Sequence, residues 1–161
     1  NTQPNDATIQ KFCMGNSPGS CGQHGGLYQW REAMAHDVGE PAGICPTGWH
    51  IPSDDEWKTL EISLGMSAAE ADEQSEWRGT DQGTQLMEGA ANFDSPLVGY
   101  AGSVMGGYYD FINDGSSCGF WTSSAAGGNA WHRALHEDHT EIYRALYAQS
   151  EEALSVRCLR D

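Results

Sequence analysis

The segment 45–60 constrains the fold more than any other part of this 161-residue chain. It opens with Cys-Pro-Thr-Gly, which is typical of a tight turn because proline presets φ and glycine permits a positive φ. Ser53 and Glu56 then have the spacing of a capping box, which predicts that a helix begins at this point. We expect both tryptophans of the segment, Trp49 and Trp57, to lie in the core.

Five cysteines indicate how the chain is held together: Cys13, Cys21, Cys45, Cys118 and Cys158. None forms a C-x-x-C pair, so a structural zinc site is not expected. Cys13 and Cys21 bracket a polar, glycine-containing loop, which predicts a short disulfide-closed loop. A Cys45–Cys158 bridge would close a loop of more than one hundred residues and would stabilise the fold by about 4–5 kcal/mol in the chain-entropy model. Cys118 is then free, either as a small buried side chain or as a reactive or intermolecular thiol.

Two disulfides favour an oxidising compartment, so we expect a secreted, extracellular protein. The formal net charge of −15 disfavours nucleic acid and anionic lipid as partners. No apolar run reaches the ~18 residues of a membrane span, and we expect no membrane insertion by this segment. The chain opens at a polar Asn1 without a signal peptide, which is expected of a mature or trimmed product.

The residue patterns predict an α+β fold in one domain over residues 11–161, after a polar lead-in at 1–10. Apolar spacing predicts a short helix over residues 27–34, and a second capping box begins another helix at Ser67. Residues 79–118 are expected to form a long irregular loop region. Strands are predicted over residues 120–124, 129–136, 140–148 and 153–159, the middle two as an antiparallel hairpin. In the last strand Cys158 shares a face with Leu154, so it points inward, toward Cys45.

Taken together, several motifs resemble the Fibrobacter succinogenes major paralogous domain over nearly the whole chain. They are Cys-Gly at 21–22, Gly-Gly-Leu-Tyr-Gln-Trp at 25–30, Gly-Ile-Cys-Pro-Thr-Gly-Trp-His-Ile-Pro-Ser at 43–53, Gly-Thr-Asp-Gln-Gly-Thr at 79–84, Phe-Trp-Thr-Ser-Ser at 120–124 and Ser-Val-Arg-Cys at 155–158. The resemblance implies a C-type-lectin-like fold near the formylglycine-generating-enzyme branch. Such a fold has short N-terminal helices packed on a small twisted antiparallel sheet. The resemblance also implies exported bacterial surface proteins, some of them behind a pilin-type N-terminal helix.

No catalytic constellation is recognisable in the chain. The sequence lacks a G-x-S-x-G elbow, an H-E-x-x-H pair and a phosphate-binding loop. The related formylglycine-generating enzymes hold copper with a cysteine pair, and here Cys118 has no partner left once the two bridges are assigned. We therefore expect a protein that is not an enzyme and carries no cofactor, apart from a candidate calcium site.

Two sets of side chains are candidate metal ligands. The calcium candidates carry oxygen atoms in the irregular region: Asp94, Asp110, Asn113 and Asp114. Their alternative role is to form turns. His132 and His136 would lie about 13 Å apart along a strand, too far to share an ion. His136 and His139 would approach one another across the hairpin turn, or would simply be exposed.

Aromatic and hydrogen-bonding side chains in the second half of the chain are the candidate ligand-binding residues: Tyr109, Asp110, Trp121, Trp131, His132, Tyr143, Arg144 and Tyr147. This combination suits a surface glycan or a protein partner, although more than half of the rings are also expected to serve as core. We expect the functional residues between 92 and 147 and a structural role for the segment 45–60. The alternative function is a globular subunit of a pilus-like or other extracellular filament, with copies of itself as partners.

Overall fold

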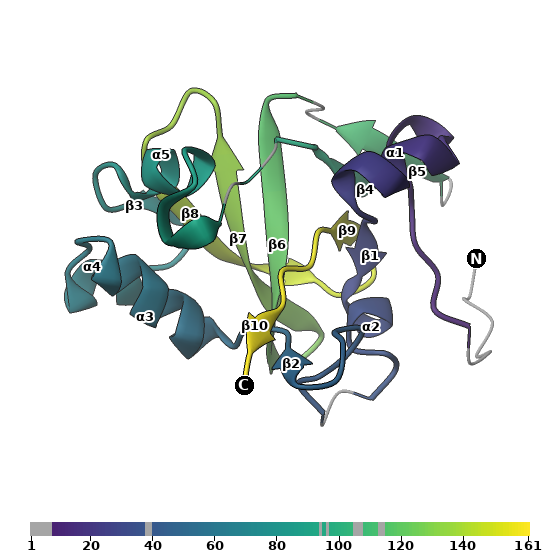
Figure 1. The fold of residues 1–161 in the computed structure, drawn as a ribbon, viewed down its shortest axis with the longest axis horizontal. Helices are drawn as coiled ribbons and strands as arrows, with labels where there is room; N and C mark the ends of the chain where they lie inside the picture. Colours follow the sequence, from purple (N-terminus) through teal and green to yellow (C-terminus); the bar gives the residue numbers. More distant parts are fainter. Residues whose placement is uncertain (1–7, 38–39, 94, 96, 105–107, 113–114) are drawn as a thin grey trace.

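The computed structural model describes residues 8–37, 40–93, 95, 97–104, 108–112 and 115–161. Short helices and three antiparallel sheets form an α+β fold, as the residue patterns predicted (Figure 1). Among the described residues, every helix is too short or too polar to span a bilayer.

The largest sheet has the strand order β3-β8-β7-β6. Its strands are β3 (Glu76–Arg78), β6 (Ser117–Ala126), β7 (Asn129–His136) and β8 (Ile142–Ala148). The predicted hairpin is confirmed, since β7 and β8 pair antiparallel with His132 opposite Ala145. The strand predicted over 120–124 is part of the longer β6, which continues to β7 through a tight turn at Gly127 and Gly128.

The second sheet has the order β1-β9-β4-β5, and it shows that the region 79–118 is more regular than expected. Its strands are β1 (Tyr28–Gln29), β9 (Glu152–Leu154), β4 (Tyr100–Val104) and β5 (Tyr108–Ile112). The β4 and β5 strands form an antiparallel hairpin, and β4 also pairs with β9. The expectation of an irregular loop was wrong here because a strand from the far end of the chain completes the sheet.

The predicted last strand over 153–159 is interrupted. The chain leaves β9 after Leu154, and Ser155 then bonds to β6: its N–H donates to Gly119 O (2.9 Å), and its O accepts from Trp121 N (3.1 Å). The chain ends in β10 (Leu159–Arg160), which pairs antiparallel with β2 (Trp49–His50). Contacts with three different sheets therefore replace one continuous strand.

The helices are short: η1 (Met14–Asn16), α1 (Pro18–His24), α2 (Trp30–Ala33), α3 (Asp54–Ser63), α4 (Ala68–Asp72), α5 (Gln82–Met87) and η2 (Ala90–Asn92). Both predicted capping boxes are present, at Ser53 for α3 and at Ser67 for α4. The helix expected over 27–34 is reduced to α2, since Tyr28 and Gln29 pair with β9 instead. The α5 and η2 helices lie in the region expected to be irregular.

The core has two main clusters, on opposite faces of β6. Trp121 packs with Trp30, Ile51 and Leu154 on one face, and Phe120 packs on the other face in a cluster that includes Trp57. Trp57 is buried as predicted. Trp49 is 40% exposed, which corrects the expectation of two core tryptophans. The reason is its position in β2, because this strand follows the 46–49 turn at the surface and, among the described strands, pairs with β10 alone.

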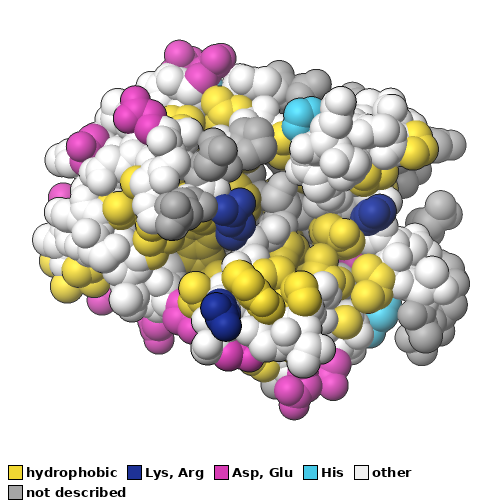
Figure 2. All heavy atoms as spheres, in the orientation of Figure 1, with side chains coloured by type: hydrophobic (Ala, Val, Ile, Leu, Met, Phe, Trp, Pro, Cys, Tyr) yellow, Lys and Arg dark blue, Asp and Glu magenta, His cyan; other side chains and the backbone are white. Residues whose placement is uncertain are grey.

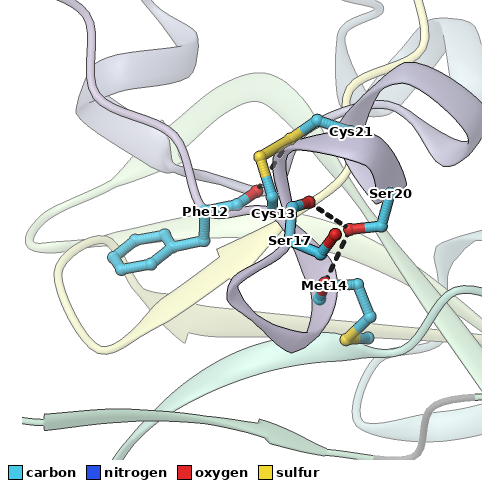
Figure 3. The surroundings of a disulfide bond; sticks show 6 residues. All are labelled: Phe12, Cys13, Met14, Ser17, Ser20 and Cys21. Carbon is cyan, nitrogen blue, oxygen red and sulfur yellow. Dashed lines mark hydrogen bonds between the residues drawn. A yellow bond between two sulfur atoms is a disulfide. The ribbon is translucent and has the colours of Figure 1, made fainter.

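Both predicted disulfides are present, Cys13–Cys21 and Cys45–Cys158. Around the first, the Ser20 hydroxyl donates to the carbonyl oxygens of Met14 (2.6 Å) and Ser17 (2.7 Å), so the short loop is also hydrogen-bonded (Figure 3). Cys118 is free and buried, and its Sγ lies 3.1 Å from Ser95 Oγ. Burial raises the pKa of the Cys118 thiol to about 11, which favours the inert interpretation over a reactive thiol.

Candidate functional site

A groove of about 620 Å³ lies between α3 and the 157–160 segment, and its volume is in the range of ligand pockets. Its lining comes from four separate parts of the chain: Trp49, Pro52, Glu56, Trp57, Leu60, Ala91, Phe93, Arg157, Cys158, Leu159 and Arg160. Hydrophobic side chains gather on this face around β2 and β10, with basic side chains beside them (Figure 2). The groove is thus mainly apolar with a few charged groups.

The wall on the α3 side consists of side chains that helical spacing places on one face of α3. Trp57 and Leu60 are three residues apart and therefore share a face of α3. Phe93, which follows η2, places its ring edge-on to the Trp57 indole at a centroid distance of 5.4 Å. This wall consists of ordered aromatic rings, since Trp57 and Phe93 are both largely buried.

The opposite lip is exposed. Trp49 and Leu159 are 40% and 42% exposed, and they are two of the four exposed large hydrophobic side chains among the described residues. They belong to the neighbouring strands β2 and β10, and the Cys45–Cys158 disulfide ties the same two segments together. An apolar lip of this kind is typical of a binding surface.

Charged groups surround the groove. The Arg157 guanidinium lies 4.9 Å from the centre of the Phe93 ring, within the range of a cation–π contact. Arg157 also lines a second, smaller hollow of about 240 Å³, together with the polar side chains of Gln23, His24, Ser95 and Ser155. It therefore separates an apolar groove from a more polar one.

His50 joins two carboxylates near the lip. Its Nε2 lies 2.9 Å from Glu56 Oε1, and its Nδ1 lies 2.6 Å from Asp161 Oδ1. The hydrogen bond with Asp161, followed by contacts with Glu56, raises the pKa of His50 against the opposing effect of burial. Glu56 also accepts from Ser53 N and Oγ, so one side chain caps α3 and holds His50.

A buried ion network fixes α3 beneath the groove. Arg133 donates from Nη1 to Asp54 (2.8 Å) and from Nε to Glu61 (2.5 Å). Arg144 donates from Nη2 to Asp54 (2.7 Å), and Arg78 donates from Nη2 to Glu61 (2.9 Å). Burial opposes ionisation of Asp54, but the two arginines outweigh it and lower its pKa to about 2. The network pairs α3 with β3, β7 and β8.

Four of the predicted ligand-binding residues lie together on one face of the largest sheet. The His132 ring contacts the other three: its centroid lies 6.3 Å from that of Trp121, 5.9 Å from that of Tyr143 and 3.8 Å from that of Tyr147. Trp121 and His132 are, however, fully buried, so they are core residues and not surface ligand contacts. Tyr143 and Tyr147 remain half-buried.

Two more predicted residues lie on the opposite face of that sheet. The Arg144 guanidinium stacks 3.8 Å from the centre of the Trp131 ring while it binds Asp54. Arg144 is buried, and its contacts are structural instead of ligand-directed. The side chains of Tyr109 and Asp110 are outside the part of the chain that the structure describes.

The histidine candidates form part of an aromatic cluster at the far end of this sheet. His139 stacks on Trp77 with a centroid distance of 3.8 Å, and its ring lies 5.8 Å from that of His136. No group of three or more side chains able to hold a metal ion occurs within the described ranges. Of the calcium candidates, Asp94, Asn113 and Asp114 lie outside those ranges, as does the side chain of Asp110.

The groove was missed because its lining residues are distant in sequence. Five of its lining residues belong to the segment 45–60, for which a structural role was expected, whereas Phe93 is the one described lining residue from 92–147. The available signal was the pairing of Cys45 with Cys158, which brings Trp49 and Leu159 side by side. Nothing in the sequence indicated that α3 would leave a hollow in front of them.

The family model of the Fibrobacter succinogenes major domain covers residues 2–160, nearly the entire chain. No curated protein and no solved structure matches the chain significantly.

Proposed function

Because the chain belongs to the Fibrobacter succinogenes major domain family, we propose that it is a non-catalytic binding module displayed outside a bacterial cell. The proposal includes a C-type-lectin-like arrangement of the fold and a ligand that is a surface glycan or a protein. Two disulfides support the extracellular location, since such bonds persist in oxidising compartments.

The observation that carries the proposal is the groove. It combines a buried aromatic wall, an exposed apolar lip and two arginines, whereas the predicted aromatic residues on the large sheet are partly or fully occupied in packing. A concave, mainly apolar site with few polar groups is the usual form of a binding site. A ligand bound in the groove would contact Trp49, Leu60 and Leu159.

The test uses two matched substitutions. Leu159→Glu places a charge at the lip of the groove, and Ile62→Glu places one at an equally exposed position on α3 outside the groove, since the two side chains are 42% and 43% exposed. The fluorescently labelled domain is applied to printed glycan and peptide arrays. We expect saturable binding that Leu159→Glu weakens about tenfold or more and Ile62→Glu leaves unchanged.

The proposal would be contradicted if the wild type bound neither array, or if the two substitutions had equal effects.

The alternative of a filament subunit makes a different prediction, that the purified domain polymerises. Sedimentation velocity on the same samples detects that outcome.

A further inference from the structure

We infer that the groove binds an extended peptide that presents an apolar side chain together with a carboxylate. This inference rests on the proposed binding function and specifies its ligand. The apolar side chain would lie between α3 and β10, against Trp57, Leu60 and Phe93. The carboxylate would lie at Arg157 and Arg160.

The distribution of positive charge supports a carboxylate. Of the eight Lys and Arg residues, Arg78, Arg133 and Arg144 are buried in the ion network. Lys58 lies within 3.5 Å of three carboxylates. The other four are exposed: Lys11, Arg31, Arg157 and Arg160.

Two of these four line one groove of a chain whose net charge is −15. Among the described residues, Glu56 lines the groove and Asp161 follows the lining residue Arg160. Both hydrogen-bond to His50, so part of their charge is balanced where they lie. Among the described residues, the lining therefore carries two arginines and one carboxylate in an otherwise acidic protein, which favours a ligand with a carboxylate.

One feature favours a peptide. The groove is bordered by consecutive residues from Arg157 to Arg160, which include β10. Within the described chain β10 pairs only with β2, so its other edge is open to an added strand.

The smaller hollow beyond Arg157 extends this site. Its Gln23, His24, Ser95 and Ser155 side chains are suited to the polar backbone of a peptide that continues past the arginine. An occupant of both hollows would pass over Arg157.

The inference is tested with hexapeptide pools that are amidated at the C-terminus and labelled with an uncharged fluorophore, so that an acidic side chain is their only carboxylate. Each pool has one fixed leucine or phenylalanine, and one position that is either acidic (aspartate or glutamate) or its neutral isostere (asparagine or glutamine). Fluorescence polarisation should show that the wild-type domain binds the acidic pools about tenfold more tightly. The double variant Arg157→Gln/Arg160→Gln should lose this preference, and Arg31→Gln, which changes an exposed arginine outside the groove, should keep it.

Equal affinity for acidic and neutral pools, or an unchanged preference in the double variant, would overturn the inference. A glycan that binds in a Leu159-dependent way while every peptide pool fails would overturn it and leave the proposed binding function standing. Self-association that the double variant abolishes would also overturn it, since the occupant would then be a second copy. Absence of any ligand in both assays would reject the inference and the proposed function together.

Discussion

His132 shows how one buried side chain couples stability to pH. Its ring stacks on Tyr147, its Nδ1 lies 3.0 Å from Ala145 O, and burial lowers its pKa to about 3. Below pH 6.5 the unfolded chain therefore binds a proton at this position that the folded protein does not. Unfolding free energy is lost at about 1.4 kcal/mol per pH unit as the pH falls through this window.

The substitution His132→Phe should remove this loss, because phenylalanine keeps a ring against Tyr147 and does not titrate. Urea unfolding of both proteins between pH 7 and pH 4.5 measures the effect as the difference between them. The difference isolates His132 from Glu152, whose pKa burial raises to about 7 and which acts in the opposite direction over the same range. A difference that does not change with pH would show that the pKa of His132 is the same in the folded and unfolded states.

Single residues also show which local expectations were reliable. Ser53 and Ser67 cap their helices as predicted, because a capping box depends on neighbours three residues apart. Trp49 was placed in the core on its residue type alone, and its exposure depends on β10, which lies over one hundred residues away. The burial of Trp121, His132 and Arg144 likewise depends on tertiary packing that side-chain chemistry does not reveal.

At the scale of elements, α5 packs unusually close to the turn between β7 and β8. A Cβ at Gly83 would lie 2.2 Å from Glu141 O and 2.8 Å from Thr140 O, both backbone atoms. Gly83→Ala should therefore lower the free energy of unfolding by about 1–3 kcal/mol, although alanine normally favours a helix. Chemical denaturation measures this change.

Gly22 in α1 is the matched control, since a Cβ there meets nothing within 4 Å. Gly22→Ala should be neutral or should stabilise the protein by up to about 1 kcal/mol. If both substitutions stabilise the protein, the close approach of α5 to the turn is not rigid.

The elements that were predicted and those that were missed differ in the range of their interactions. The β7–β8 hairpin, α3 and α4 arise from short-range patterns of turn residues, caps and apolar spacing. The β1, β4 and β9 strands form one sheet from three distant segments, so their pairing is not encoded locally. The same reason explains why the predicted last strand is divided among three sheets.

At the scale of the whole molecule, the two disulfides restrict loops of very different length. Their cysteines are 8 and 113 residues apart. Replacing Cys45 and Cys158 with serine should lower the free energy of unfolding by about 2 kcal/mol more than the same replacement of Cys13 and Cys21. Guanidinium unfolding of the two double variants measures the difference, and equal losses would show that loop length does not control it.

The candidate site was the least predictable feature at this scale. The sequence indicated that residues around Cys45 meet those around Cys158, and the disulfide confirms it. Whether a hollow remains there depends on the distance between α3 and β10, which Phe93 and Arg157 help to set. Those two residues are 64 positions apart in the numbering, and no short-range pattern relates them.

The buried ion network has a consequence for how a ligand would be received. Asp54 and Glu61 are about two turns apart on α3 and bind arginines from three strands. Rotating the helix by one residue, about 100°, or sliding it along the sheet would leave these buried carboxylates and arginines without their ion-pair partners. α3 therefore has a single docking position, and the aromatic wall that it carries is preorganised. Occupation of the groove would leave the entropy of this helix nearly untouched, so affinity gained there is not spent on ordering it.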